Sequence, residues 1–254
     1  MTDIKLDIAD GVAVVTIDRP PVNALTMALY GQIADLFDSF ANSSDVHCVV
    51  LAAAGSKAFC AGLDLHEFLA ASVDDDDERA TIVRRCFAAV RHCAVPVVAV
   101  VNGPALGAGC VLASVADICL ASPNARFSLP EINVGRCGGT AHLGRHLPQG
   151  VLRHMVFTGL PLGVEDAYRF GLVQEIVAAE SLHERAMELA KLIAGKAPLG
   201  LRLGKQSMNG AEFLPVEEGY ALEQTFSTRL MHTADAREAT RAVVEKRVPV
   251  WSGQ

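Results

Sequence analysis

The chain has 254 residues, of which 51% are hydrophobic and 20% are charged, and its formal net charge is −7. This composition is typical of a globular protein with a large core, arranged as one large domain or as a domain with an appendage. The acidic balance contains no basic cluster, and no apolar run is long enough to span a membrane. We therefore expect neither a nucleic-acid partner nor a membrane partner.

The seven cysteines are scattered, and none of them forms a Cys-x-x-Cys pair. The first residues also lack the basic and apolar regions of a signal peptide. This combination favours reduced thiols in the cytosol and gives no support to a metal site. We therefore expect a cytoplasmic protein that uses no metal.

In chain order, strands alternate with helices until about residue 177, and helices dominate after it. Apolar runs bounded by turn residues predict strands over residues 4–8, 12–17, 48–54, 97–101, 116–121 and 172–177. Apolar residues at helical spacing predict helices over residues 26–42, 81–93, 110–116, 140–146, 164–170, 182–194, 199–208, 215–230 and 234–246. We therefore divide the chain into a core, residues 1–197, and a C-terminal helical region, residues 198–254.

Two turns that follow buried strands contain small residues and glycine. The first covers residues 56–65 after the strand 48–54, and the second covers residues 102–109 after the valine-rich strand 97–101. Glycine lets a ligand approach the backbone, and a following helix presents free N–H groups at its positive end. Two such turns can converge on one oxygen atom as an oxyanion hole. The alternative is a pair of tight strand–helix connections that bind nothing.

Four short motifs follow one another along the chain: residues 59–65 (FCAGLDL), 102–110 (NGPALGAGC), 130–132 (PEI) and 138–140 (GGT). In order and spacing they resemble the enoyl-CoA hydratase/isomerase family, also called the crotonase superfamily, nearly from end to end. The resemblance implies an α/β fold with a crotonase-like spiral core of ββα turns and a C-terminal helical trimerisation region. It also implies an acyl-CoA substrate, a homotrimer or dimer of trimers, and no separate cofactor, because coenzyme A is part of the substrate.

The resemblance further implies which residues contact the substrate. The thioester carbonyl oxygen is expected between the N–H groups of Leu63 and Ala108, where Ala108 replaces the family's usual glycine. The coenzyme A arm is expected mostly against backbone, at Val22, Ala24, Ala61, Asp64, Leu65 and His66. Lys246 is expected to reach the coenzyme A phosphates, often from a neighbouring subunit. The Asn23 side chain is expected to hold its own loop instead.

The family's hydratases use two glutamates, one directly after the second turn and one twenty positions later. In this chain the first position is Val111 and the second is Glu131. Hydration needs a base and an acid, whereas moving a double bond needs one base that takes a proton from C2 and returns it at C4. We therefore expect Glu131 to be the catalytic base of an isomerase that converts 3-enoyl-CoA to 2-enoyl-CoA. The alternative is a helix-start carboxylate favoured by the helix dipole.

Departures from the family pattern leave other possibilities open. Arg136 either binds a polar acyl tail or faces solvent, and we favour solvent because arginine is rarely buried unpaired. His142 and His146 are expected to be packing or surface residues. Gly139 stands where dienoyl-CoA isomerases carry an aspartate, which disfavours that activity. A hydratase, a thioester hydrolase, a decarboxylase or a weakly catalytic acyl-CoA-binding protein stay as alternatives.

Overall fold

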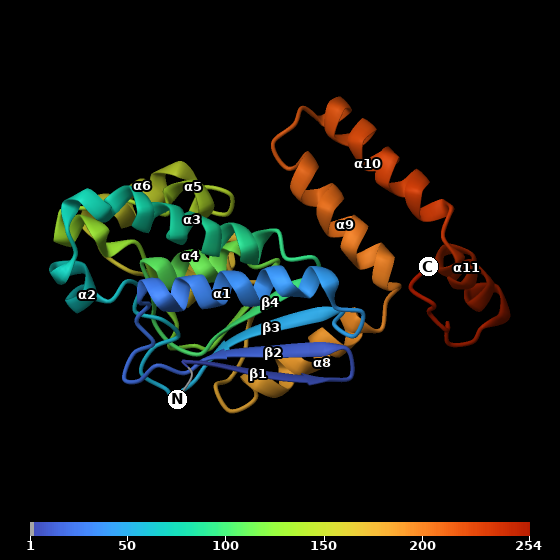
Figure 1. The fold of residues 1–254 in the computed structure, drawn as a ribbon, viewed down its shortest axis with the longest axis horizontal. Coiled ribbons are helices and arrows are strands. Elements are labelled where there is room, and N and C mark those ends of the chain that lie inside the picture. The colour runs from blue at the N-terminus through green and yellow to red at the C-terminus, as the bar shows by residue number, and fades with distance from the viewer. Residues whose placement is uncertain (1–2) are drawn as a thin grey trace.

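A six-stranded sheet forms the centre of the computed structural model, which describes residues 3–254 (Figure 1). The strand order is β1-β2-β3-β4-β6-β9, in which β1 is antiparallel to β2 and all later neighbours are parallel. The strands are β1 (Ile4–Ala9), β2 (Val12–Ile17), β3 (Cys48–Ala53), β4 (Val97–Val101), β6 (Ile118–Ala121) and β9 (Glu175–Ile176). The continuous apolar sequences of β3 and β4 suit strands that are covered on both faces.

Eight helices accompany this sheet and its connections in the described part of the chain. They are α1 (Met27–Ser39), α2 (Leu65–Ala70), α3 (Asp76–Arg91), α4 (Ala108–Val115), α5 (Thr140–Leu143), α6 (Gln149–Thr158), α7 (Val164–Phe170) and α8 (Leu182–Ala194). Shorter 3₁₀ turns cover Phe40–Asn42, Val73–Asp75 and Pro130–Val134. Thr26 caps α1, because its hydroxyl accepts a hydrogen bond from the N–H of Leu29 at 3.2 Å.

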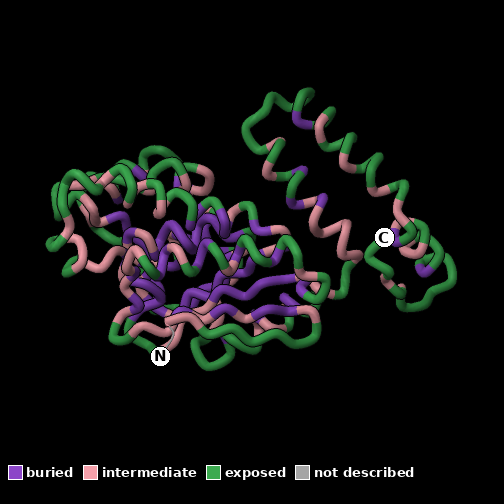
Figure 2. Tube along the Cα trace, viewed as in Figure 1, coloured by how far each residue is buried: buried purple, intermediate pink, exposed green. Residues whose placement is uncertain are grey.

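The helices cover the sheet on two sides, and the burial pattern follows the alternation of side chains along each strand (Figures 1 and 2). Val49 and Leu51 of β3 face the cluster that includes Ile33 of α1, together with α3 and α4. Val50 faces the opposite cluster with Ala186 of α8. Successive residues of β3 thus pack into two hydrophobic clusters, one on each face of the sheet, which is why this strand contains no polar residue.

A second, smaller sheet connects the two glycine turns to the PEI motif. Its strands are β5 (Ala105–Leu106), β7 (Arg126–Ser128) and β8 (Leu162–Gly163). Ala105 pairs with Phe127, and an isolated bridge joins Cys60 to Ala105. Since β7 leads directly into the 3₁₀ turn Pro130–Val134, this pairing brings three distant segments of the chain together. The sequence did not predict these three strands.

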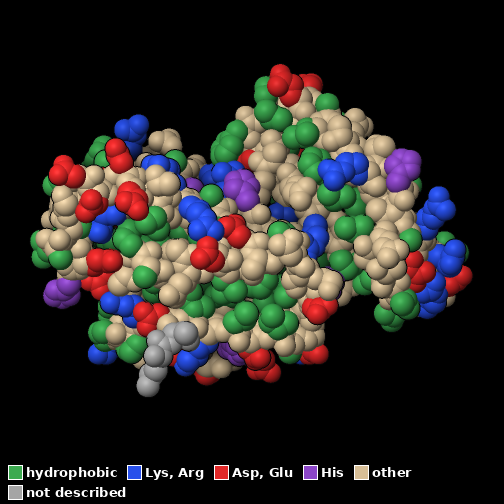
Figure 3. Space-filling model, in the orientation of Figure 1, with side chains coloured by type: hydrophobic (Ala, Val, Ile, Leu, Met, Phe, Trp, Pro, Cys, Tyr) green, Lys and Arg blue, Asp and Glu red, His purple; other side chains and the backbone are tan. Residues whose placement is uncertain are grey.

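Helices α9 (Pro198–Ala211), α10 (Val216–Met231) and α11 (Ala234–Glu245) form a C-terminal arm that projects from the core (Figure 1). The space-filling view shows a notch between the arm and the core (Figure 3). Buried Lys205 of α9 joins the two, since its Nζ donates to Asp117 Oδ2 at 2.6 Å and to the carbonyl of Val95 at 3.1 Å. Asp117 therefore has a structural role.

The α/β architecture and the C-terminal helical region agree with the sequence analysis, whereas the boundary at residue 198 stays a prediction. Several elements are shorter than predicted, and two of them clearly so. The last strand covers only Glu175–Ile176, and α5 ends at Leu143 instead of continuing to His146. Within residues 3–254, no helix combines the length and the apolar character needed to cross a membrane.

Candidate active site

The first glycine turn pairs with the loop before α1, and this pairing leaves one N–H group unused. The N–H of Leu25 donates to the carbonyl of Gly62 at 2.7 Å, and the N–H of Asp64 donates to the carbonyl of Leu25 at 2.9 Å. Successive N–H groups of an extended segment point to opposite sides. The N–H of Leu63 therefore points away from the loop, and it has no hydrogen-bond acceptor among the described residues.

The second glycine turn presents the N–H of Ala108. The N–H of Gly107 donates to the carbonyl of Ser128 at 2.9 Å, whereas Ala108 is the first residue of α4 and its N–H lacks an acceptor in the described part of the chain. The positive φ of this turn falls on Gly107, at +52°, and not on Ala108. The alanine methyl group is therefore compatible with the turn.

The two turns lie in contact with each other. A Cβ added to Gly62 would lie 3.4 Å from the Ala108 nitrogen and 2.8 Å from the Leu106 oxygen. Gly62 also has a φ of +89°, which side-chain-bearing residues rarely adopt. Gly62 is thus needed both for its positive φ and for the close contact between the two glycine turns. The free N–H groups of Leu63 and Ala108 line the same cavity.

Glu131 enters this cavity from the 3₁₀ turn after β7. A Cβ added to Gly107 would lie only 2.8 Å from Glu131 Oε1, so the carboxylate lies against the second glycine turn. Its Oε2 is buried and has no hydrogen-bond partner within residues 3–254. Burial raises the pKa of Glu131 above its ordinary value, which strengthens the carboxylate as a base.

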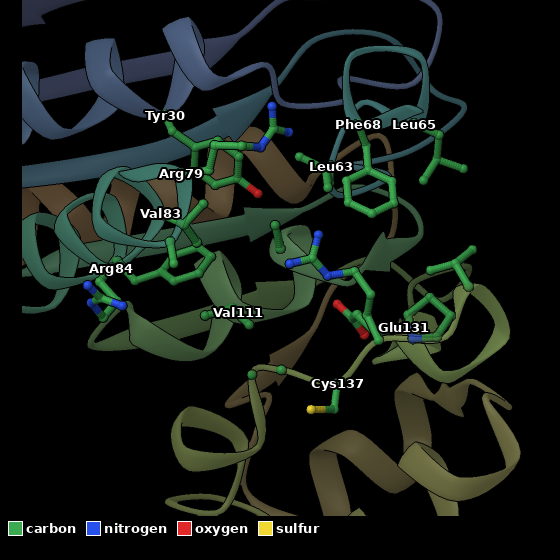
Figure 4. A pocket seen from close by; sticks show the side chains of 18 of the residues that line it. Tyr30, Leu63, Leu65, Phe68, Arg79, Val83, Arg84, Val111, Glu131 and Cys137 are labelled. Atoms are coloured by element: carbon green, nitrogen blue, oxygen red, sulfur yellow. The ribbon is translucent and has the colours of Figure 1, made fainter. Parts of the chain in front are cut away.

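The cavity has a volume of about 500 Å³ and is lined by residues of α1, α2, α3 and α4 and of the segment 130–142 (Figure 4). Ala61, Leu63, Leu65, Ala108 and Glu131, which were named from the sequence, all line it, and their contacts with a substrate stay predictions. Val111 also faces the cavity and is 2% exposed. The position of the first hydratase glutamate is therefore an apolar part of the wall.

The other predicted substrate contacts lie outside this cavity. Val22 and Ala24 belong to the loop that holds the first glycine turn, and His66 is exposed on α2. The Asp64 carboxylate caps α2 and binds Arg19 at 2.8 Å. The N–H of Glu67 and the guanidinium of Arg19 hold the pKa of Asp64 below its ordinary value. Asp64 therefore has a structural role in the free protein.

Two further residues that were named from the sequence, Asn23 and Lys246, also lie outside the cavity. The buried Asn23 amide donates to the carbonyls of Ala54 and Ala58, so it holds its loop as expected. Lys246 ends α11 in the C-terminal arm, far from α2 and α3 in Figure 1. The structure does not bring Lys246 to the cavity within one chain, and its contact with a neighbouring subunit stays a prediction.

Arg136 corrects the sequence analysis, which favoured an exposed position. Its guanidinium lies 4.7 Å from the centre of the Phe68 ring and donates to Asp76 Oδ1 at 2.8 Å, and the residue lines the cavity. An aromatic face and a carboxylate together make a partly buried arginine acceptable. His142 packs against Phe87 and also lines the cavity, and His146 contacts the carbonyl of Ser114, so both rings make the packing contacts that were expected.

One wall of the cavity was not recognised from the sequence. Asp76, Arg79, Val83 and Phe87 of α3 all line it. Their spacing of three or four residues places them on one helix face, a signal that the sequence contains. The other face of the same helix carries the apolar residues from which the helix was predicted.

Known proteins resemble the chain over almost all of its length. The family described as Enoyl-CoA hydratase/isomerase matches residues 7–254. A (7aS)-7a-methyl-1,5-dioxo-2,3,5,6,7,7a-hexahydro-1H-indene-carboxyl-CoA hydrolase of Rhodococcus jostii (strain RHA1) is 37% identical over 89% of this chain and 88% of its own. A short-chain-enoyl-CoA hydratase of Clostridium acetobutylicum is 33% identical over 97% of this chain and 96% of its own.

Solved structures agree with this assignment. The crystal structure of an enoyl-CoA hydratase from Bacillus anthracis has a TM-score of 0.95 and 29% identity, with 100% of both chains covered. The chain therefore belongs to the enoyl-CoA hydratase/isomerase family, which confirms the resemblance drawn from the four motifs. The predicted α/β crotonase-like fold with a C-terminal helical region is confirmed as well, whereas trimerisation stays a prediction. The names of the relatives include a hydratase and a hydrolase, so they do not single out isomerisation.

Proposed function

We propose that this protein is an acyl-CoA enzyme that moves the double bond of a 3-enoyl-CoA to the 2-enoyl position. Glu131 serves as the only base, and the N–H groups of Leu63 and Ala108 form the oxyanion hole. The observation that carries the proposal is the position of the Glu131 carboxylate beside Gly107, next to these two donors, in a cavity that is also lined by the apolar Val111.

The reaction begins when ionised Glu131 removes a proton from C2. The electron pair of the C2–H bond then spreads through the double bond and onto the thioester oxygen, which becomes an enolate. Two fixed N–H donors stabilise this negative charge more than they stabilise the neutral carbonyl. Protonated Glu131 returns the proton at C4, and the product is the conjugated 2-enoyl-CoA. The proton stays within the site, so the reaction needs no cofactor.

A single carboxylate suits this sequence of steps better than it suits hydration. Hydration requires activation of a water molecule and delivery of a proton to carbon, and family hydratases use a second glutamate at the place of Val111. One well-placed acid or base contributes about 10²–10⁴-fold in rate. We therefore expect isomerisation of a 3-enoyl-CoA to exceed hydration of a 2-enoyl-CoA by at least roughly tenfold.

The test is an ultraviolet assay of conjugated thioester with both substrates, on wild type and two variants. Glu131→Gln should abolish isomerisation and keep coenzyme A binding, because it removes the base and preserves the shape. Val111→Glu should raise hydration if the valine alone prevents it. Faster hydration than isomerisation by wild type would refute the one-carboxylate argument, and full activity of Glu131→Gln would reduce Glu131 to a structural residue.

Hydrolysis is the second candidate, and it is favoured by the 37% identity to a protein named as a CoA hydrolase. The same oxyanion hole would stabilise the negative charge that forms when water adds to a carbonyl group, with Glu131 as the base for the water. Liquid chromatography of the products separates the two candidates. A hydrolase forms a product heavier by one water or releases free coenzyme A, whereas an isomerase changes neither mass nor thiol content.

The C-terminal arm further suggests a homotrimer or a dimer of trimers. The tube coloured by burial shows that most of the arm is exposed or half-buried in the single chain (Figure 2). Large apolar side chains are exposed along it, at Met208, Phe213, Val216, Tyr220, Met231, Val243 and Val244. Extended apolar surfaces of this kind are typical of subunit interfaces. In such an assembly Lys246 would lie near the site of a neighbour.

A further inference from the structure

The cavity is rich in positive charge for a site that receives a hydrocarbon chain. Arg79 and Arg84 of α3 line it, together with Arg136, whose N–H donates to the carbonyl of Glu131 at 2.9 Å. Three guanidinium groups stand against two carboxylates, Asp76 and Glu131, which leaves an excess of positive charge in the cavity. In Figure 4, Arg79 and Arg84 lie on the side of the cavity opposite Glu131.

Arg79 and Arg136 belong to one cluster. Asp76 and Arg79 are three residues apart on α3 and therefore lie on the same helix face. Arg136 is joined to that face by its hydrogen bond to Asp76, and its guanidinium is stacked on Phe68. Asp76 thus balances Arg136. The Nη2 of Arg79 is shielded from solvent and has no hydrogen-bond partner among residues 3–254.

An unbranched fatty acyl chain would be a poor occupant of this part of the cavity. It would remove water from the guanidinium of Arg79 without offering a hydrogen-bond acceptor, and an uncompensated buried charge is costly. A carboxylate would instead accept two hydrogen bonds in the planar geometry that arginine prefers. The unbalanced charge therefore favours an anionic group over a methyl group.

The position of the cluster assigns it to the acyl part of the substrate. Val22 and Ala24, which are expected to border the coenzyme A arm, line none of this cavity. Ala61 and Leu65, which are also expected there, line it beside Leu63, so the arm enters along the first glycine turn and the walls from α3 and α5 are left for the acyl group. With the thioester oxygen at Leu63 and Ala108, the cavity that extends toward α3 is the space beyond the reacting carbons.

We propose that the acyl group of the substrate carries a second carboxylate, remote from the thioester, which Arg79 binds with Arg136 beside it. The substrate class is then a coenzyme A thioester of a dicarboxylic acid. This inference rests on the proposed function for the position of the thioester, and it adds the chemistry of the far end of the acyl chain.

The first experiment measures binding by calorimetry, with saturated thioesters that cannot isomerise. Fatty acyl-CoAs of six, eight and ten carbons are each compared with the analogue of equal length that ends in a carboxylate. At one length or more, the carboxylate form should bind at least about tenfold more tightly, the usual effect of a hydrogen bond between charged groups. Equal or weaker binding of the carboxylate form at every length would overturn the inference.

The second experiment asks whether Arg79 is the receptor. Arg79→Gln should lower the ratio of carboxylate to methyl affinity by about tenfold or more, and Arg79→Lys should retain part of it. Arg85→Gln is the matched control, because Arg85 lies on the same helix but binds Asp35 and Asp38 away from the cavity. It should keep the wild-type ratio.

Two outcomes separate this inference from its rivals. If Arg79→Gln weakens both members of each pair and free coenzyme A to the same extent, Arg79 binds the coenzyme A phosphates and the inference is refuted. If the carboxylate preference exists but wild type isomerises none of the unsaturated dicarboxylic thioesters, the proposed function fails and the substrate class remains supported. The wild-type comparison decides the inference even if Arg79→Gln does not fold.

Discussion

Replacement of Gly107 by alanine tests the geometry that joins the oxyanion hole to the base. Gly107 has a φ of +52° and a ψ of −119°, a region that is open almost only to glycine. Holding an alanine there costs about 1–3 kcal/mol. For a chain of this size each kcal/mol lowers the melting temperature by about 2–4 °C. We therefore expect Gly107→Ala to melt about 2–12 °C below wild type.

The same methyl group should also displace the base. It would lie 2.8 Å from Glu131 Oε1, and ordinary van der Waals contact begins at 3.4 Å. The carboxylate must therefore move by roughly 0.6 Å, and a misplacement of about 1 Å costs on the order of 10² in rate. We expect kcat for the 3-enoyl-CoA substrate to fall about 10- to 100-fold.

The assay combines thermal unfolding with steady-state kinetics, and Gly31→Ala is the control. Gly31 lies within α1 and has nothing within 4 Å of an added Cβ. Alanine is the better helix former, so this variant should be more stable by about 0.5–1 kcal/mol and equally active. A Gly107→Ala protein with the kcat and melting temperature of wild type would refute the reasoning about this turn.

Four further predictions concern pH, the arm and the assembly. Burial raises the pKa of Glu131, and Glu131 must be ionised to act as the base. The acid limb of the kcat/KM profile should therefore lie above pH 4.5, the ordinary pKa of a glutamate. An acid limb below that pH would contradict the burial of the base. Because burial disfavours the ionised form of Glu131, ionisation lowers the free energy of unfolding. Wild type should therefore lose stability relative to Glu131→Gln as the pH rises through the raised pKa of Glu131. Lys205→Met should lower the free energy of unfolding in urea by about 1–3 kcal/mol, because the carbonyl of Val95 loses the Lys205 donor and Asp117 loses one of two donors, keeping the N–H of Val97. An unchanged midpoint would contradict the role of Lys205 in joining the arm to the core. Light scattering at micromolar concentration should give the mass of a trimer or hexamer, and a monomer would contradict the role assigned to the exposed apolar residues of the arm.

The reacting end of the site could be predicted because local sequence determines most of it. The apolar run 97–101 indicates a buried strand, and the cap of α1 by Thr26 follows from its hydroxyl and the helix after it. Gly62 and Gly107 mark the turns that need positive φ. These features depend on residues close together in the chain, so the sequence specifies them before any tertiary contact forms.

The short strands of the second sheet could not be predicted for the opposite reason. Strand β5 has two residues and β7 has three, too few to show an alternating pattern. They are strands only because Ala105 meets Phe127 across a gap of more than twenty residues. Arg136 was assigned to solvent by the same limitation, because its carboxylate and aromatic partners, Asp76 and Phe68, are about sixty residues away along the chain.

The reacting end of the cavity and the part lined by α3 and Arg136 are determined by different features of the chain. Leu63, Ala108 and Glu131 are placed by glycine turns and by strand pairing, and these belong to the fold shared with relatives that carry different names. The far wall is placed by one face of α3 and by the loop that carries Arg136. Side chains on a helix face can change without disturbing the sheet, because their contacts lie toward the cavity. A family match therefore supports the enolate chemistry, whereas the identity of the acyl group depends on charges such as Arg79 that only the assembled cavity brings together.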